Sequence, residues 1–112
     1  MLRIIKEKAT EELLKEAAKD LDGYIKVVVD IKRGILSAGG TKHVDGEQLL
    51  LQNGSRQEDL WGGGLDLETS GMDFDSMINI RPSQNNPSRE ILDQNIRSQV
   101  EAITRKILEI KK

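Results

Sequence analysis

The segment 24–30, with the sequence YIKVVVD, limits the possible folds more than any other part of the chain. It is short, rich in β-branched residues, and bounded by Gly23 and by the turn Lys32-Arg33-Gly34, which is typical of a β-strand. A second strand over residues 35–38 follows at hairpin distance and ends at Gly39-Gly40. These two segments predict a β-hairpin.

Two amphipathic helices are expected, one near each end of the chain. Thr10 offers an oxygen to the free N–H groups of a first helix that begins at Glu11. The last helix begins at Asp93, or as early as Asn86-Pro87, where a cap residue precedes a proline. Lys111-Lys112 at its end suits the negative end of the helix dipole. Apolar residues three and four positions apart predict one narrow seam that faces the sheet or a partner helix, formed by Ile96, Val100, Ile103, Ile107 and Ile110.

Residues 45–54 allow two interpretations. They form either a short helix capped by Asp45 or two strands around an Asn53-Gly54 hairpin turn. Because the residues between Glu47 and Gln52 show no period-two alternation, we favour the helix.

Three further strands complete the expected fold. Residues 2–5 predict an opening strand, and residues 57–67 predict a strand in which Gly62-Gly63-Gly64 forces a bulge or bend. Residues 74–80 predict a central strand, which Pro82 ends. The element order is β-α-β-β-α-β-β-α. It predicts one α+β domain over residues 1–112, with a mainly antiparallel sheet covered by helices.

The composition excludes several classes of protein. A chain of 112 residues is long enough for one hydrophobic core, and its net charge of −2 gives no global field that attracts nucleic acid. The absence of cysteine excludes a disulfide framework and a thiol nucleophile. The charged N-terminus lacks the apolar segment of a signal peptide, and no run of roughly eighteen apolar residues occurs. We therefore expect a cytoplasmic protein that is not bound to a membrane.

His43, Asp45 and Glu47 form the most metal-like cluster, because imidazole and carboxylate groups are good ligands for divalent zinc, manganese or iron. On a strand the three would share one face, and the turn before a helix could also bring them together. Asp59 or Asp75 would then act as the general base. In the alternative interpretation Asp45 caps a helix, Glu47 is a charge in its first turn, and His43 lies on the surface of a loop.

The connection between the last predicted strand and the last helix is unusually polar. Arg81 and Arg89 could hold a carboxylate or phosphate, aided by N–H groups at the start of the last helix. Trp61 is expected in the core, or as a platform beside a pocket. In the alternative interpretation the polar residues make a turn and a cap, while the arginines pair with carboxylates. The further ligand-binding candidates in this connection are Asn79, Ser83 and Gln84.

Four stretches of sequence resemble a known family. They are KVVVDI, GG followed by H-x-D-x-E, LLLQNGSRQEDLWG, and FDSMINIRPSQ followed by N-x-x-S-R. Over nearly its whole length the chain is similar to a family of small bacterial and archaeal proteins known as a domain of unknown function, and the resemblance implies no activity. The chain departs from the family pattern at Gly62-Gly63-Gly64, where a single glycine and then bulkier strand residues are expected.

Three functional hypotheses follow. The first is a small cytoplasmic binding or interaction domain, homodimeric through its last helix or an exposed strand edge, whose 81–89 loop faces a small anionic ligand. The second is a metal-dependent hydrolase with a divalent metal on His43, Asp45 and Glu47. The third is a subunit that only supports a larger assembly. The sequence does not decide whether the protein is an enzyme.

Overall fold

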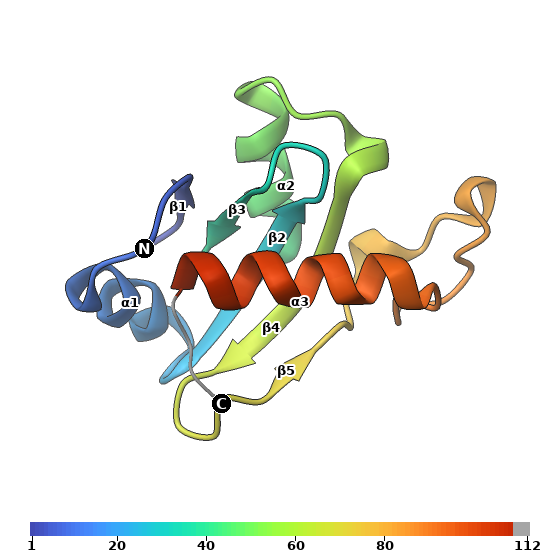
Figure 1. The fold of residues 1–112 in the computed structure, drawn as a ribbon. Coiled ribbons are helices and arrows are strands. Elements are labelled where there is room, and N and C mark those ends of the chain that lie inside the picture. The colour runs from blue at the N-terminus through green and yellow to red at the C-terminus, as the bar shows by residue number, and fades with distance from the viewer. Residues whose placement is uncertain (109–112) are drawn as a thin grey trace.

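A five-stranded antiparallel sheet forms the centre of the molecule (Figure 1). The computed structural model describes residues 1–108. The strand order is β1-β3-β2-β4-β5, so the predicted hairpin of β2 and β3 lies inside the sheet and β1 and β5 form its edges. The predicted α+β class and element order are confirmed. The strands are β1 (Arg3–Ile5), β2 (Tyr24–Asp30), β3 (Ile35–Ala38), β4 (Leu60–Asp66) and β5 (Met72–Asp73).

Helices cover both faces of the sheet. α1 (Glu11–Ala18) and α3 (Gln94–Leu108) pack on one face, and α2 (His43–Gln52) packs on the other (Figure 1). Within residues 1–108, no helix is long and apolar enough to cross a membrane. Short 3-10 turns lie at Lys19–Leu21 (η1), Gln57–Asp59 (η2), Met77–Asn79 (η3) and Pro82–Gln84 (η4).

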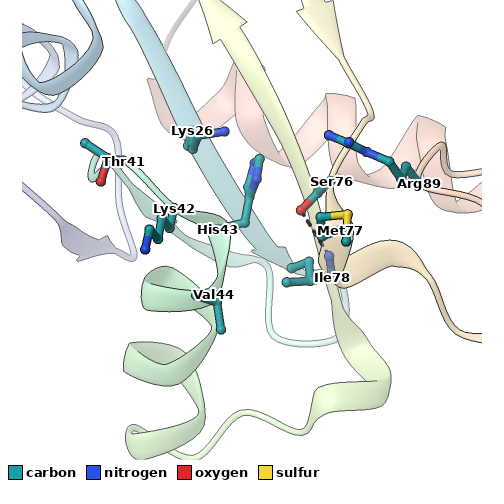
Figure 2. A pocket seen from close by; sticks show the side chains of 9 residues that line it. All are labelled: Lys26, Thr41, Lys42, His43, Val44, Ser76, Met77, Ile78 and Arg89. Carbon is teal, nitrogen blue, oxygen red and sulfur yellow. Dashed lines mark hydrogen bonds between the residues drawn. The ribbon is translucent and has the colours of Figure 1, made fainter.

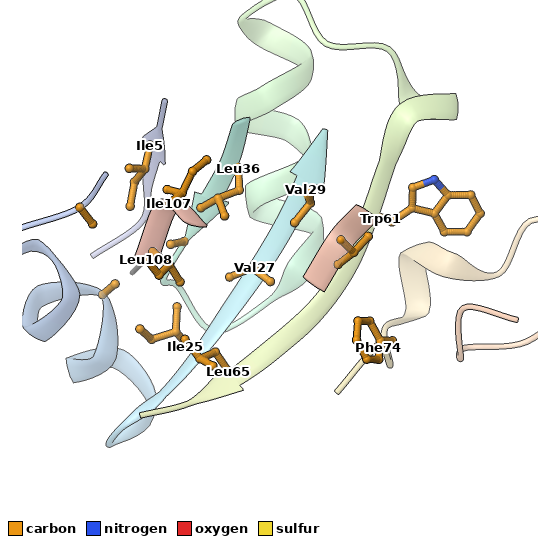
Figure 3. Packing of buried hydrophobic residues seen from close by; sticks show 14 of the residues in the cluster. Ile5, Ile25, Val27, Val29, Leu36, Trp61, Leu65, Phe74, Ile107 and Leu108 are labelled. Atoms are coloured by element: carbon orange, nitrogen blue, oxygen red, sulfur yellow. The ribbon is translucent and has the colours of Figure 1, made fainter. Parts of the chain in front are cut away.

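The alternation of side chains along the strands produces two cores. Val27 and Val29 of β2 lie in the larger core with α1 and α3 (Figure 3). Val28 points to the opposite face and packs in the smaller core with Leu50 of α2. The predicted seam of α3 faces the sheet, since Val100 and Ile107 are buried in the larger core. The last predicted seam residue, Ile110, and the predicted helix end at Lys111-Lys112 lie outside the described residues.

The predicted N-terminal boundaries of the outer helices are confirmed. Thr10 Oγ1 accepts a hydrogen bond from Leu13 N at 3.1 Å at the start of α1. Asp93 Oδ1 accepts hydrogen bonds from Asn95 N at 2.7 Å and Ile96 N at 3.2 Å. α3 therefore begins after Asp93, and the earlier alternative at Asn86-Pro87 is wrong.

The helical interpretation of the ambiguous segment is correct, but its start is not. α2 begins at His43, two residues before the predicted cap. Asp45 lies in the first turn, and the N-cap position belongs to Lys42, whose side chain makes no capping hydrogen bond. The start of α2 therefore presents free backbone N–H groups.

The predicted central strand over residues 74–80 is wrong. The strand that pairs with β4 near this segment is β5, which ends just before residue 74 and forms an edge of the sheet. Met77 is 64% exposed in a 3-10 turn. The side chain of Asn79 takes the place of a strand backbone, because its Oδ1 accepts from Gly62 N and its Nδ2 donates to Gly62 O.

The predicted bulge in β4 is also wrong. β4 begins at Leu60 and pairs residue for residue with β2 along its whole length. The glycines are instead required by close neighbours. A Cβ atom at Gly63 would lie 2.5 Å from Asp73 O, and one at Gly64 would lie 1.7 Å from Tyr24 Oη. The Tyr24 hydroxyl donates a hydrogen bond across this gap to Asp73 Oδ2 at 2.5 Å, so it cannot move away without breaking that bond.

The Gly64→Ala substitution tests this close approach. We expect it to lower the free energy of unfolding by about 1–3 kcal/mol or more, as overpacked sites do, because the methyl group would displace the Tyr24 ring. Gly71→Ala is the matched control, since the nearest atom there is the Thr69 hydroxyl oxygen at the end of an exposed side chain. Urea unfolding curves for both variants measure the difference. Equal stability of the two variants would contradict the account.

Candidate functional site

A cavity of about 280 Å³ opens beside the first residues of α2 (Figure 2). Its walls come from β2, from the start of α2 and from the 74–92 segment that follows β5. Lys26, His43 and Arg89 reach it from these three parts of the chain. The cavity is therefore built by segments that are distant in sequence. Its other lining residues are Thr41, Lys42, Val44, Ser76, Met77 and Ile78.

Positive charge surrounds this cavity. Lys26, Lys42 and Arg89 line it. Arg89 Nε forms an exposed ion pair with Asp75 Oδ1 at 2.9 Å, but neither lysine forms an ion pair with any carboxylate within residues 1–108. The Lys26 ammonium lies 5.9 Å from the centroid of the Tyr24 ring, where the face of the ring attracts it. The two lysines thus supply positive charge that is not held in an ion pair within residues 1–108.

The start of α2 adds a second source of positive potential. Its N-cap, Lys42, makes no side-chain hydrogen bond to the first turn. Free N–H groups and the helix dipole both favour an anion at such a terminus. Both effects act at the wall of the cavity, which Lys42, His43 and Val44 form.

His43 is the most constrained group of the site. It is 9% exposed, and its Nε2 lies 2.7 Å from the Gly63 carbonyl oxygen. Since a carbonyl oxygen only accepts, Nε2 carries the proton and Nδ1 carries a lone pair. Burial lowers the pKa of His43, and the charge of Lys26 lowers this pKa further, against the opposing effect of the Gly63 hydrogen bond. The ring is therefore uncharged at neutral pH.

The first glycine of β4 explains how His43 fits against the sheet. A Cβ atom at Gly62 would lie 2.7 Å from Ser76 Cβ and 3.2 Å from His43 Cδ2. Any larger residue would push both side chains off the strand. The absence of a side chain at Gly62 therefore lets His43 and Ser76, two residues of the cavity wall, lie directly against β4.

The predicted ligand-binding arginine Arg81 is engaged inside the protein. It is 8% exposed, and its guanidinium donates to the carbonyl oxygens of Gln57, at 2.5 Å, and of Leu60. It also donates to Gln84 Oε1 at 3.1 Å, and its Cζ lies 3.9 Å from the centroid of the Trp61 ring. Arg81 therefore joins the 81–86 loop to the start of β4, and it does not line the cavity with Arg89.

The remaining polar residues of that loop are divided between structural contacts and solvent. Asn79 is fully buried and makes four hydrogen bonds, with Gly62 N, Gly62 O, Phe74 O and Arg89 O. Gln84 Nε2 donates to Glu58 O at 3.0 Å, whereas Ser83 is exposed.

The predicted metal ligands do not converge. Residues two apart on a helix point in different directions, so Asp45 is exposed while His43 and Glu47 are buried. His43 is bound to Gly63 O, and Glu47 Oε2 lies 3.5 Å from Gln57 Nε2. Within residues 1–108 no group of three or more His, Asp or Glu side chains is placed to hold a metal ion. The three predicted ligands are therefore not assembled into one cluster within the described residues.

The other candidates are not among the residues that line the cavity. Asp59 belongs to the 3-10 turn before β4, and Asp75 is paired with Arg89. Trp61 is 1% exposed and packs in the larger core beneath Arg81, as the core interpretation expects. Sequence reasoning missed Lys26 and Lys42. The available signal was Lys26 itself, a charged residue between the apolar residues Ile25 and Val27 of a mostly buried strand.

Comparison with known proteins agrees with the resemblance seen in the sequence. Residues 3–107 match the family described as "Protein of unknown function (DUF5674)". The chain belongs to this family. No curated protein and no solved structure matches the chain. The role of this DUF5674 protein must therefore be argued from its own residues.

Asn79→Ala tests whether the polar residues of segment 74–92 hold the fold of this DUF5674 protein. We expect a loss of about 1–3 kcal/mol in the free energy of unfolding for each buried partner left unsatisfied. Asn95→Ala is the matched control, since Asn95 is exposed on α3 and should change stability by less than about 0.5 kcal/mol. Thermal and urea unfolding measure both variants. An Asn79 variant as stable as the control would refute the structural role.

Proposed function

We propose that this protein is a small binding domain that takes an anionic small molecule in the cavity at the start of α2. One observation carries the proposal: three cationic side chains from three separate segments line one cavity, and two of them have no carboxylate partner within residues 1–108. Placing like charges together raises the electrostatic free energy of the folded protein. A bound anion would offset this cost, which is the simplest reason for the arrangement.

The geometry suits direct recognition of an oxyanion. Lys26 is half-buried on β2, so its ammonium is screened less by solvent than a fully exposed lysine would be. A charge-assisted hydrogen bond from such a group contributes about 1.5–3 kcal/mol. The start of α2, with its free N–H groups, and the positively charged residue Lys42 belong to the same wall and add to the attraction.

The rim of the cavity is apolar, which suits a ligand with a carbon skeleton. Val44 is 45% exposed and Met77 is 64% exposed, and Ile78 lies beside them in the lining. Exposed apolar groups around a polar site are typical of ligand pockets. An anion with an attached apolar group would cover this rim, whereas a bare inorganic ion would leave it open to water.

The proposed anion site differs in its residues from the site expected from the sequence. Arg89 keeps its predicted role, while Lys26 and Lys42 replace Arg81, whose guanidinium binds backbone carbonyl groups. The hydrolase alternative receives no support, because the described residues provide no metal cluster and neither Asp59 nor Asp75 lines the cavity.

Location and assembly remain predictions of the sequence. We propose a cytoplasmic location on the basis of the cysteine-free composition. For a homo-oligomer we propose the strand edges, because the α3 seam is occupied by the sheet of its own chain. Light scattering after gel filtration measures the oligomeric state.

Substitution of the two lysines tests the binding site. We expect Lys26→Gln and Lys42→Gln each to weaken the binding of small oxyanions by about tenfold, since each removes one charge-assisted hydrogen bond. The probes are phosphate, sulfate and benzoate, and calorimetry or NMR titration measures their affinities at constant ionic strength.

Lys32→Gln provides the matched control, because it removes an exposed lysine from the β2–β3 turn, away from the cavity. We expect it to leave the affinities unchanged. No detectable binding of any probe to the wild-type protein, or an equal loss in all three variants, would overturn the proposed function.

A further inference from the structure

We infer that the ligand group bound at this site is a phosphate that keeps one acidic proton, donated to Nδ1 of His43. The inference rests on the proposed function and narrows the class of anion. It depends on a cavity that presents positive charge from Lys26, Lys42 and Arg89 together with one hydrogen-bond acceptor from His43.

The hydrogen bond to Gly63 fixes the role of each ring nitrogen. Nε2 must donate to the carbonyl oxygen 2.7 Å away, so the uncharged ring offers only the lone pair of Nδ1 to the cavity. Nδ1 makes no hydrogen bond within residues 1–108. Nor is it among the buried side-chain atoms that lack a partner, which are Trp61 Nε1, Arg81 Nε and Thr104 Oγ1. Nδ1 is therefore accessible from solvent, and a ligand can reach it.

The charges around the ring keep it in this state before a ligand binds. Burial and Lys26 of β2 disfavour the imidazolium form, whereas Asp73 of β5 and Asp75 favour it. Asp75 is paired with Arg89, and Asp73 accepts the Tyr24 hydroxyl, so both carboxylates already have partners. Together with Lys42 and Arg89 at the cavity wall, Lys26 makes a further positive charge on His43 unfavourable.

This combination distinguishes oxyanions of similar size and charge. Hydrogen phosphate offers charged oxygens to the cations and one O–H group to Nδ1. Sulfate has no proton near neutral pH, so its oxygen would face the lone pair of Nδ1 and leave that acceptor unsatisfied. A protonated phosphate monoester also carries one O–H group, so the hydrogen bond to Nδ1 favours phosphate over sulfate for both the free ion and the monoester.

Affinities for inorganic phosphate and sulfate, measured by calorimetry at about pH 7.5 and constant ionic strength, test the inference. We expect phosphate to bind about tenfold more tightly or better, the effect of one hydrogen bond to a charged group. We expect this ratio to fall as the pH is lowered and His43 becomes a donor on Nδ1. Equal affinities, or tighter sulfate binding, would overturn the inference while leaving the proposed anion site intact. If neither ion nor any other oxyanion binds, both fail.

Two further measurements separate the role of His43 from effects on folding. His43→Phe keeps a planar ring and removes the Nδ1 acceptor, so the phosphate and sulfate affinities of this variant should come within about twofold of each other, a ratio that a change in stability does not mimic. His43 is the only histidine, so its ¹⁵N ring signals need no assignment. We expect a protonated Nε2 and an unprotonated Nδ1 in the free protein, and a change at Nδ1 with phosphate. A proton on Nδ1 in the free protein would overturn the inference.

Phenyl phosphate distinguishes the two sources of a phosphate group. Tighter binding than inorganic phosphate would indicate a monoester whose carbon skeleton covers Val44 and Met77. The second pKa of a phosphate monoester is about 6, so phenyl phosphate in solution at about pH 7.5 has lost its last acidic proton. Binding of the protonated form should therefore take up close to one proton from the buffer. Calorimetry in two buffers of different ionisation enthalpy measures this uptake. Weaker binding would indicate free phosphate. Binding of phenyl phosphate without proton uptake would contradict the proposed hydrogen bond to His43.

Discussion

The close approach of neighbouring groups to the backbone of β4 at Gly62, Gly63 and Gly64 is the constraint on which the rest of the structure depends. Gly62 admits Ser76 and His43, while Gly63 and Gly64 admit the backbone of β5 and the hydroxyl of Tyr24. With side chains at these positions, α2 and the segment after β5 could not lie against the strand as they do. The same absence of side chains gives His43 access to the Gly63 carbonyl group. The absence of side chains on this part of β4 therefore explains both the packing of α2 and the position of His43 in the proposed site.

The polar segment 74–92 is held to β4 mainly by side chains. Asn79 and Arg81 satisfy backbone groups of residues 57–62, and Asn86 Nδ2 donates to three carbonyl groups of its own loop. Buried amide groups of this kind stabilise a loop when their partners are present, as they are for the side chains of Asn79 and Asn86. Arg89, at 57% side-chain exposure, remains on the cavity side, and Met77 forms part of the rim.

The sequence predicted those elements whose signals are local. The β-branched segment 24–30, the cap at Thr10 and the start of the last helix at Asp93 each depend on a few neighbouring residues, and each prediction is confirmed. The strand predicted over 74–80 failed because an Asn79 side chain does the pairing that a strand backbone would do. The guanidinium of Arg81 donates to carbonyl groups more than twenty residues away, a contact that no local pattern reveals. The site was found only in part, since the contribution of Lys26 depends on the folding of three segments.

The central claim is that an anion binds at the start of α2, against the glycine face of β4. The most direct measurement is an NMR titration of ¹⁵N-labelled protein with inorganic phosphate. The account predicts that the largest amide shifts occur in residues 41–44, 62–64 and 76–78, together with the His43 ring signals. Shifts centred on residues 81–86, with residues 41–44 unchanged, would contradict it and return the anion site to the loop around Arg81.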